Sequence, residues 1–389
     1  MSHAPRPIGG GLITPFTLFL AVLAAIGGYF VLQRFIYGFN AAAAFNDGYT
    51  WGIWIAYDVV IGTAFGCGGY VMALLVYVFN KGQYHPLVRP ALLASLLGYG
   101  LGAVSVVVDL GRYWNMWHMM WPGYAQPNSV MLEVGLCVAI YVMVLFVEFS
   151  PAFLERFGLT NLKRKVEKWM VLFIALGILL PTMHQSSLGT MMVIFGHQIH
   201  PLWQTTLLPL LFLMSAITMG FCIVIFEASL ASAGFRRPGE AHILGGLSGV
   251  IIALQLVWLT TRFVDLHLAG KMDLVLGSGW LSGFFLAEIA LFALPVLLLL
   301  PKANRTSPRP LFLAAVAMLL GGSLYRIDVF LVAYFPATPG FSYFPSVPEI
   351  MVTLGIVAFE FLAYIVLART LPVLPGVEPA KVAVLQPAE

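Results

Sequence analysis

Charged residues and cysteine are scarce in this 389-residue chain. Only 10% of its residues are charged, against roughly 25% in soluble domains. Such a chain cannot form a water-facing surface, which excludes an ordinary soluble enzyme. The formal net charge of +3 is too small to favour a nucleic-acid partner. The three cysteines lie singly in apolar runs at Cys67, Cys137 and Cys222, so the sequence predicts no iron–sulfur cluster, zinc site or disulfide framework.

What the chain has instead is apolar sequence in long stretches. Hydrophobic residues make up 60% of it, and the mean hydropathy is +0.92. A helix needs about 20 apolar residues to cross a bilayer. Ten such stretches predict an all-α, polytopic membrane protein of helical bundles, with residues 1–389 forming a single integral membrane domain. The predicted spans lie near 14–34, 51–79, 88–110, 129–150, 168–190, 205–230, 242–262, 279–300, 310–334 and 348–370.

The basic residues predict an orientation. Fifteen of the twenty Lys and Arg residues lie at the amino terminus, in every second loop and at the carboxyl end, where Lys381 is counted. Arg326 lies within a span. The four in the remaining loops are Arg34, Arg112, Arg262 and Lys271. Because cytoplasmic loops carry the excess of Lys and Arg, both chain ends are predicted to be cytoplasmic.

Acidic residues occur within the predicted spans, where charge is costly and function is the default hypothesis. The eight are Asp58, Asp109, Glu133, Glu148, Glu227, Glu288, Asp328 and Glu360. Arg326 is the one base predicted at such depth, so most of these carboxyls lack an evident cation. The candidates for proton transfer are Asp58, Glu148, Glu227, Glu288, Asp328 and Glu360. The alternative is structural: Glu148 and Glu227 reach the cytoplasmic interface, and any single acid near the midplane bonds a neighbouring helix.

A polar group interrupts the apolar pattern at "LPTMHQSSLGTMM" (180–192), near the outer end of a predicted span. Asp109 and Arg112 have the i, i+3 spacing of a helical ion pair and lie at the same predicted depth. A quinone head group needs hydrogen-bond partners, a proton source and aromatic walls. The candidate quinone-binding residues are His184, Gln185, Ser187, Asp109, Arg112, Trp114 and Glu133. The alternative is a helix cap with a hydrogen-bonded histidine.

Haem and metal are disfavoured by the histidine positions. A membrane b-type haem needs paired histidines at matching depth. His184 is the only histidine placed inside a predicted span, because His242, the first residue of the 242–262 stretch, is assigned to the cytoplasmic side. His197 and His200 share no metal-site spacing with His184. We therefore expect neither haem nor metal.

Several long motifs resemble the NrfD/polysulfide-reductase family of integral membrane subunits, and within it the HybB-like branch that serves periplasmic nickel–iron hydrogenase-2. The blocks are "NDGYTWGIWIAYDVVIGTAFGCGGY" (46–70), "NKGQYHPLVRPALLASLLGYGLG" (80–102), "DLGRYWN" (109–115), "LPTMHQSSLGTMM" (180–192) with "HPLWQ" (200–204), and "FEFLAYIVLARTLPVLP" (359–375). Asp58, Asp109, Arg112, Glu133, His184, Gln185 and Ser187 stand within or beside them.

The resemblance implies a haem-free, quinone-reactive anchor in the bacterial inner membrane. It implies menaquinone as the electron acceptor near the periplasmic side. It also implies a periplasmic ferredoxin-like iron–sulfur subunit, joined to nickel–iron hydrogenase large and small subunits. The aromatic outer loops suit docking of such a partner as well as a membrane-interface belt.

Three other interpretations stay open. The chain could serve another respiratory oxidoreductase, such as a molybdenum enzyme. A proton-coupled secondary transporter would also carry intramembrane acids, but it would function alone and would usually show broken helices and repeats. A purely structural anchor would leave the acids without a purpose.

Overall fold

The computed structural model describes residues 5–376, so Lys381 of the basic-residue count lies outside the described part. Within that part the regular structure is helical, with two isolated β-bridges and no strand. Ten helices are long and apolar enough to cross a membrane. The prediction of an all-α protein with ten spans is confirmed.

The first five spans form most of the N-terminal half. α1 covers Pro15–Tyr37. The second span combines η2 (Trp54–Val59), α2 (Gly62–Phe65), α3 (Gly68–Ala73) and η3 (Leu74–Val78). The next three are α4 (Val88–Asp109, preceded by η4, Gly82–Leu87), α5 (Val130–Arg156) and α6 (Thr160–Ile194), with η5 (Tyr113–Met120) between α4 and α5.

The second half has five further spans. They are α7 (Leu208–Gly234), α8 with α9 (Ala241–Leu244 and Ser248–Leu268), α11 (Trp280–Leu299), α12 with η9 (Pro308–Ile327 and Asp328–Val332) and α13 (Val347–Thr370). The short helix α10 (Leu274–Gly277) joins α9 to α11.

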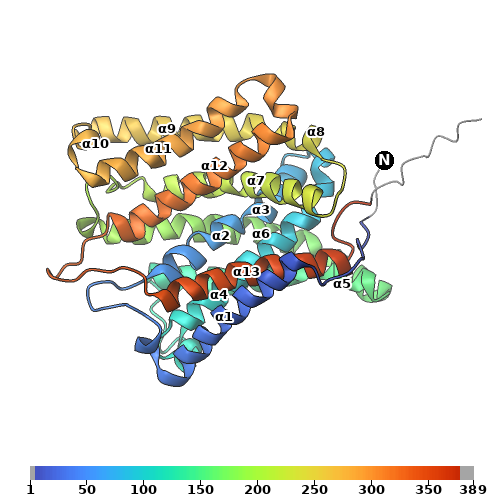
Figure 1. Ribbon diagram of the computed structural model, residues 1–389, viewed down its shortest axis with the longest axis horizontal. Coiled ribbons are helices and arrows are strands. Elements are labelled where there is room, and N and C mark those ends of the chain that lie inside the picture. Colours follow the sequence, from blue (N-terminus) through green and yellow to red (C-terminus); the bar gives the residue numbers. More distant parts are fainter. Residues whose placement is uncertain (1–4, 377–389) are drawn as a thin grey trace, which may run out of the picture.

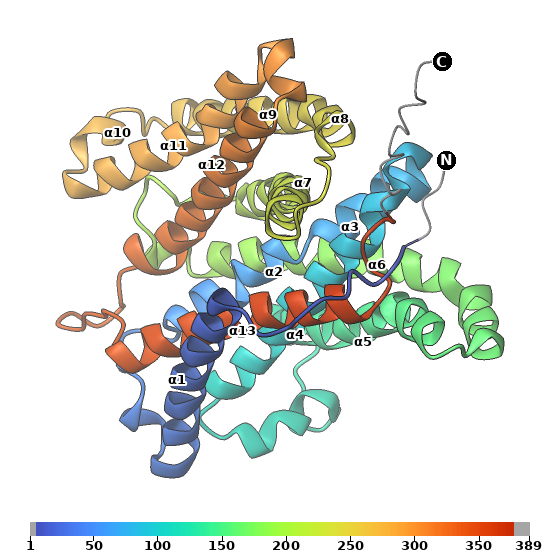
Figure 2. The same cartoon turned by 45° about the vertical axis from the view of Figure 1, so that its right-hand side comes forward.

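The spans gather into two bundles and one outlying pair. The second span, α4, α5 and α6 pack together as the N-terminal bundle, and α7, α9, α11 and α12 form the C-terminal bundle. α7 contacts α3 and α6 and so joins the two. α9, α11 and α12 run along one side of the molecule, while α1 and α13 lie on the opposite side beside α4 (Figures 1 and 2).

The second span is irregular and central. Its first and last turns are π-helical, a geometry found often at functional sites. Glycines allow neighbouring helices to approach it closely. A Cβ atom added at Gly66 would lie 2.5 Å from the Tyr99 ring, and one added at Gly220 would lie 2.9 Å from the Cys67 carbonyl oxygen. Both α4 and α7 therefore pack directly on this span.

The first and last spans meet through glycine. A Cβ atom added at Gly27 of α1 would lie 2.7 Å from the Gly355 Cα atom of α13, so the two backbones are almost in contact. Outside the helices, the Arg6 amide donates to the Leu374 carbonyl at 3.2 Å. Both described ends of the chain therefore lie at the same end of the bundle. Which membrane face that end occupies stays a prediction.

Several helices run further than predicted. α5 continues to Arg156 and α6 begins at Thr160, and their projecting ends share a cluster in which Arg89 and Lys163 pair with Glu155 at 2.7 and 2.6 Å. α1 and α9 extend by three and six residues beyond their predicted ends, 34 and 262. Arg34 and Arg262, assigned to loops from the sequence, are therefore buried helical residues. Arg326 is not the only base buried in the spans.

Candidate functional site

Three side chains from two helices form a buried polar cluster, which we call the His184 cluster: His184, Gln185 and Thr63. The Thr63 hydroxyl donates to the Val59 carbonyl at 2.6 Å. Its oxygen accepts from Gln185 Nε2 at 3.1 Å and lies 3.1 Å from His184 Nε2. Since the only hydroxyl proton is already used, Nε2 of His184 must carry the hydrogen.

This assignment leaves the other ring nitrogen free. In the neutral ring one nitrogen donates and the other accepts. Nδ1 of His184 is therefore an acceptor, and it is buried without a partner among the described residues. Such an atom is the exception in protein interiors and calls for an explanation. It gives the cluster one unused hydrogen-bond acceptor.

Arg326 links this cluster to the second bundle. The side chain is fully buried, and its Nη2 donates to Gln185 Oε1 at 3.3 Å. Its other partners are neutral: the Val60 and Gly322 carbonyls and the Ser215 hydroxyl, at 3.1 to 3.2 Å. No carboxylate within residues 5–376 lies within 4.0 Å of it. The cluster therefore carries an uncompensated positive charge.

Aromatic rings wall the cluster. Tyr99 meets His184 edge to face, with ring centroids 5.7 Å apart, and packs in the same way on Tyr141 at 4.5 Å. The guanidinium carbon of Arg326 lies 5.2 Å from the centre of the Phe212 ring. Aromatic rings therefore pack against both the histidine and the guanidinium.

Ser187 and Glu133, two of the candidate quinone-binding residues, contact each other. The Ser187 hydroxyl donates to Glu133 Oε1 at 2.7 Å, joining α6 to α5. Ser187 is buried, whereas Glu133 is partly exposed. This hydrogen bond connects α6 to the first turn of α5.

Asp109, Arg112 and Trp114 are placed differently from the prediction. α4 ends at Asp109 and Leu110 is extended, so the i, i+3 helical spacing does not apply. No Asp109–Arg112 ion pair forms within the described residues, and Arg112 is exposed; the predicted pair is wrong. Trp114 is 60% exposed. Neither exposed side chain lines the buried His184 cluster.

Arg34, and not Arg112 as predicted, is the basic residue that contacts the end of α4 beside Asp109. Its Nε donates to the Val108 carbonyl at 2.7 Å, and its Nη2 donates to the Leu110 carbonyl. The guanidinium therefore caps the end of α4 and contributes positive charge near Asp109. One carboxyl oxygen of Asp109 is buried without a partner in the described structure.

The proton-transfer candidates divide between the two bundles. Asp58 accepts from Thr353 at 3.3 Å, and its charge interacts with that of Glu360 on α13. Glu148 is buried against Gly177, where an added Cβ atom would lie 2.6 Å from its Oε1. Glu288 and Asp328 lie fully buried in the C-terminal bundle. The six proton-transfer candidates do not form one continuous chain of direct contacts with His184.

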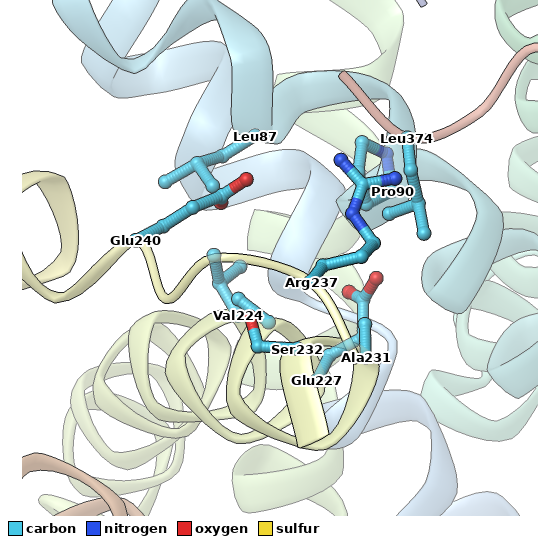
Figure 3. A pocket seen from close by; sticks show the side chains of 10 residues that line it. Leu87, Pro90, Val224, Glu227, Ala231, Ser232, Arg237, Glu240 and Leu374 are labelled. Atoms are coloured by element: carbon cyan, nitrogen blue, oxygen red, sulfur yellow. The ribbon is translucent and has the colours of Figure 1, made fainter. Parts of the chain in front are cut away.

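Glu227 borders a small cavity near the described chain ends (Figure 3). It accepts from the Tyr364 hydroxyl. The cavity measures about 20 Å³, enough for one water molecule. Arg237 and Glu240 also line it, from the segment that follows α7. Burial raises the pKa of the Glu240 carboxyl and lowers the pKa of the Arg237 guanidinium, while each charge partly offsets the effect on the other.

A larger cavity of about 320 Å³ lies at the C-terminal end of α6. Met192, Leu208, Asp265 and Lys271 are among its lining residues. Met192 is seven residues beyond Gln185, about 10 Å along the helix. Apolar and charged groups thus meet in a space comparable to a small-ligand site.

Metal and haem ligands do not gather in the described part of the chain. Within residues 5–376 no group of three or more His, Cys, Asp or Glu side chains is arranged to hold a metal. The third span includes His85, and the seventh includes His242 and His267, so the prediction that only His184 lies in a span is wrong. All three residues are exposed and lie within the first or last four residues of their spans, whereas His184 is buried.

Two residues of this site were missed from the sequence: Thr63, a member of the cluster, and Tyr99, which packs against it. Each is a polar side chain at a glycine-rich, closely packed point of an apolar run, and that is the signal that could have identified them. Arg34 was missed because its helix extends beyond the predicted end.

The sequence also matches known proteins. The family model "Polysulphide reductase, NrfD" matches residues 41–337. The chain belongs to the NrfD family. The resemblance stated from the motifs is confirmed, and so is a multi-pass membrane protein.

Three relatives are informative. The "Probable Ni/Fe-hydrogenase 2 b-type cytochrome subunit" of Escherichia coli K12 is 44% identical over 378 residues, covering 96% of each chain. The "Menaquinone reductase, integral membrane subunit" of Nitratidesulfovibrio vulgaris is 26% identical over 85% of this chain and 84% of the relative. A selenate reductase subunit of Mesobacillus selenatarsenatis is 24% identical over 91% of this chain and 92% of the relative. Each name describes that relative.

Proposed function

We propose that this chain is the quinone-reactive membrane subunit of a respiratory hydrogenase complex. It passes electrons from H2 oxidation, through an iron–sulfur subunit, to menaquinone. The similarity to the hydrogenase-2 subunit over 96% of both chains supports the hydrogenase. The similarity to a menaquinone reductase subunit supports the quinone. The observation that carries the proposal is the buried His184 cluster with its one free acceptor, Nδ1.

The chemistry requires two electrons and two protons for each quinone reduced to quinol. The electrons come from the partner's iron–sulfur cluster, since the described residues of this chain offer no redox ligand set. His184 accepts a proton at Nδ1 and passes it to one quinone oxygen, while Nε2–H stays fixed by Thr63. Gln185 orients the ring of the substrate, and Glu133 with Ser187 supplies the second proton. Arg326 stabilises negative charge that develops on the quinone.

Arg112 and Trp114 have a different role in this proposal from the quinone binding predicted for them. Because both are exposed at the segment after α4, they contact the partner subunit and not the quinone. Asp109, at the end of α4 with one unpartnered carboxyl oxygen among the described residues, remains a quinone-site candidate. Other exposed aromatic side chains in the outer loops include Trp117, Trp121 and Phe344.

We further propose that the chain binds no haem. The residues present do not fit one: Nε2 of His184 is engaged by Thr63, and no second described histidine lies at its depth. The words "b-type cytochrome" in the name of the Escherichia coli relative describe that protein.

The remaining parts of the proposal concern assembly and protons. The complex lies in the bacterial inner membrane with both chain ends cytoplasmic and the His184 end periplasmic. Its partners are a ferredoxin-like iron–sulfur subunit and nickel–iron large and small subunits. Protons reach the site from the cytoplasm through Glu227, Glu148, Glu360 and Glu288, so turnover is electrogenic. Proteoliposomes that reduce quinone without generating a membrane potential would remove this last step.

A second candidate is the same role beside a different catalytic subunit. The similarity to the selenate reductase subunit favours it specifically. Genes for a nickel–iron large subunit next to this one would decide for the hydrogenase, and genes for a molybdenum subunit would decide for the alternative.

His184→Ala in the assembled complex tests the quinone site. We expect H2-dependent menaquinone reduction to fall at least tenfold, while dye reduction by the hydrogenase subunits is unchanged. The matched control is His267→Ala, which alters an exposed histidine in the last turn of α9. Normal quinone reduction by an assembled His184→Ala complex would refute the proposed site.

A further inference from the structure

Glu288 and Asp328 form a pair of carboxyl groups inside the C-terminal bundle. Glu288 lies on α11 and Asp328 opens the π-helical turn η9, and both are fully buried. The pair is separate from the His184 cluster, whose side chains belong to α2 and α6. Neither side chain borders either of the two cavities described above.

The hydrogen bonds of the pair do not balance if both acids are ionised. Trp203 Nε1 donates to Glu288 Oε2 at 2.8 Å. The other oxygens, Glu288 Oε1 and both of Asp328, have no donor among the described residues. Yet α11 packs against η9, and the two carboxyls interact with each other across that contact. Two carboxylates are both acceptors, so a hydrogen bond between them exists only if one carries a proton.

The nearby charges give the number of protons. Arg262 is the cation whose charge acts on Glu288 in the described structure. It is 1% exposed, and its Nε and Nη1 lack hydrogen-bond partners there. One guanidinium balances one negative charge, so two carboxyls with a single proton make the buried group neutral. Membrane interiors strongly favour that neutral state.

The other charged and polar groups around this core leave that balance unchanged. Asp265 lies 3.8 Å from Arg262, but with Lys271 it lines the 320 Å³ cavity, where the two opposite charges offset each other. Arg326 faces the His184 cluster through its carbonyl and amide partners. Tyr325 acts on the pair as a neutral phenol, and its buried hydroxyl has no described partner. None of these residues changes the conclusion that one proton on the Glu288–Asp328 pair makes the buried group neutral.

The backbone around Asp328 is also specialised. Asp328 is the first residue of η9, a π-helical turn that directly follows α12. Trp51 of the N-terminal half donates to the carbonyl of Phe330 within this turn at 2.8 Å. The turn that carries Asp328 therefore connects mechanically to the irregular second span.

We propose that Glu288 and Asp328 share one proton and form a proton-storage site in the C-terminal bundle. Its function, to hold a proton during turnover, rests on the proposed proton transfer. The shared proton itself does not, because it follows from contacts and charge alone. Trp203 and Arg262 are positioning residues that hold the pair together.

Infrared difference spectroscopy of the full chain in lipid nanodiscs measures how many protons the Glu288–Asp328 pair holds. The variants are Glu288→Gln, Asp328→Asn and the double variant. With one shared proton, each single variant loses one protonated-carboxyl band and no carboxylate band, because the remaining acid ionises beside Arg262. The double variant loses one band of each kind. Each single loss in the protonated-carboxyl region then equals the loss in the double variant.

Other outcomes overturn the proposal. Two independent protons would make the single losses add up to the double loss, with no carboxylate lost. A fully ionised pair would lose carboxylate bands only. If Asp328→Asn leaves the acid band in place, the proton belongs to Glu288 alone and is not shared. Should one single variant fail to fold, the double variant still separates one, two and no protons by its two band losses.

A matched control is Glu148→Gln, a buried acid of the N-terminal bundle. Its difference spectrum should add to that of Glu288→Gln when the two are combined. Quinone reduction is measured on the same variants in the assembled complex. A wild-type complex that reduces no quinone would refute the proposed function and leave the infrared result untouched. If the band losses of Glu288→Gln and Asp328→Asn instead add up to the loss in their double variant, only the shared proton is refuted.

Discussion

The hydroxyl of Thr63 organises the His184 cluster, and replacing it tests that arrangement directly. Thr63→Val keeps the shape of the side chain and removes the oxygen that His184 and Gln185 both use. Hydrogen bonds between membrane helices are worth about 0.6 kcal/mol on average and up to about 1.7 kcal/mol. Losing two of them costs about 1–3 kcal/mol.

The same 1–3 kcal/mol applies to the activation free energy of quinone reduction if Thr63 holds the His184 ring in its reactive orientation. Since about 1.4 kcal/mol corresponds to a factor of ten, menaquinone reduction should fall about 5- to 150-fold. Thermal unfolding of the purified complex measures the stability loss, and H2-dependent quinone reduction measures the rate. Dye reduction by the hydrogenase subunits should not change.

Thr63→Ser is the matched control, because it keeps the oxygen and removes only a methyl group. It should retain most of the quinone activity. If Thr63→Val and Thr63→Ser behave alike in the rate assay, the hydroxyl does not organise the site. Equal rates in both variants and the wild type would show that the cluster is a structural contact between α2 and α6.

Two further predictions concern other parts of the molecule. Gly27→Ala places a methyl group 2.7 Å from the Gly355 Cα atom and should lower the free energy of unfolding by about 1–3 kcal/mol. Gly28→Ala, whose added methyl group meets no atom within 4 Å, is the control and should not change thermal unfolding measurably. Equal melting temperatures for the two variants would contradict the close contact. Burial raises the pKa of Glu240 above its ordinary 4.5, so its contribution to stability is fully present below pH 4.5 and is lost as the pH rises through the raised value. Limited proteolysis of the segment after α7 should therefore accelerate over that pH range in the wild type but not in Glu240→Gln, and identical profiles would exclude Glu240 as the cause.

Hydropathy predicts the spans well because each must match the thickness of the bilayer. The same reasoning fails at helix ends that leave the membrane, where α1, α5, α6 and α9 continue as ordinary helices. That is why Arg34 and Arg262 were assigned to loops. The Asp109–Arg112 pair was predicted from helical spacing, and α4 ends at Asp109, where this spacing stops.

Contacts between helices are harder to predict because they depend on rotation and depth. His184, Gln185 and Ser187 were identified as one polar group from a single helix, and the structure adds their partners Thr63 and Glu133 from others. The acids Glu288 and Asp328 were each recognised, but not as neighbours, because 39 intervening residues and a loop separate them. The π-helical turn that orients Asp328 has no simple signal in the residue pattern.

The glycine contact between α1 and α13 has a consequence for biosynthesis. The ribosome makes α1 first and α13 last, so α1 must remain in the bilayer without its final neighbour until nearly the whole chain has been inserted. A chain cut short before residue 347 leaves a glycine face of α1 open to lipid and to other helices. Synthesis of α13 is thus required before the glycine face of α1 can be covered.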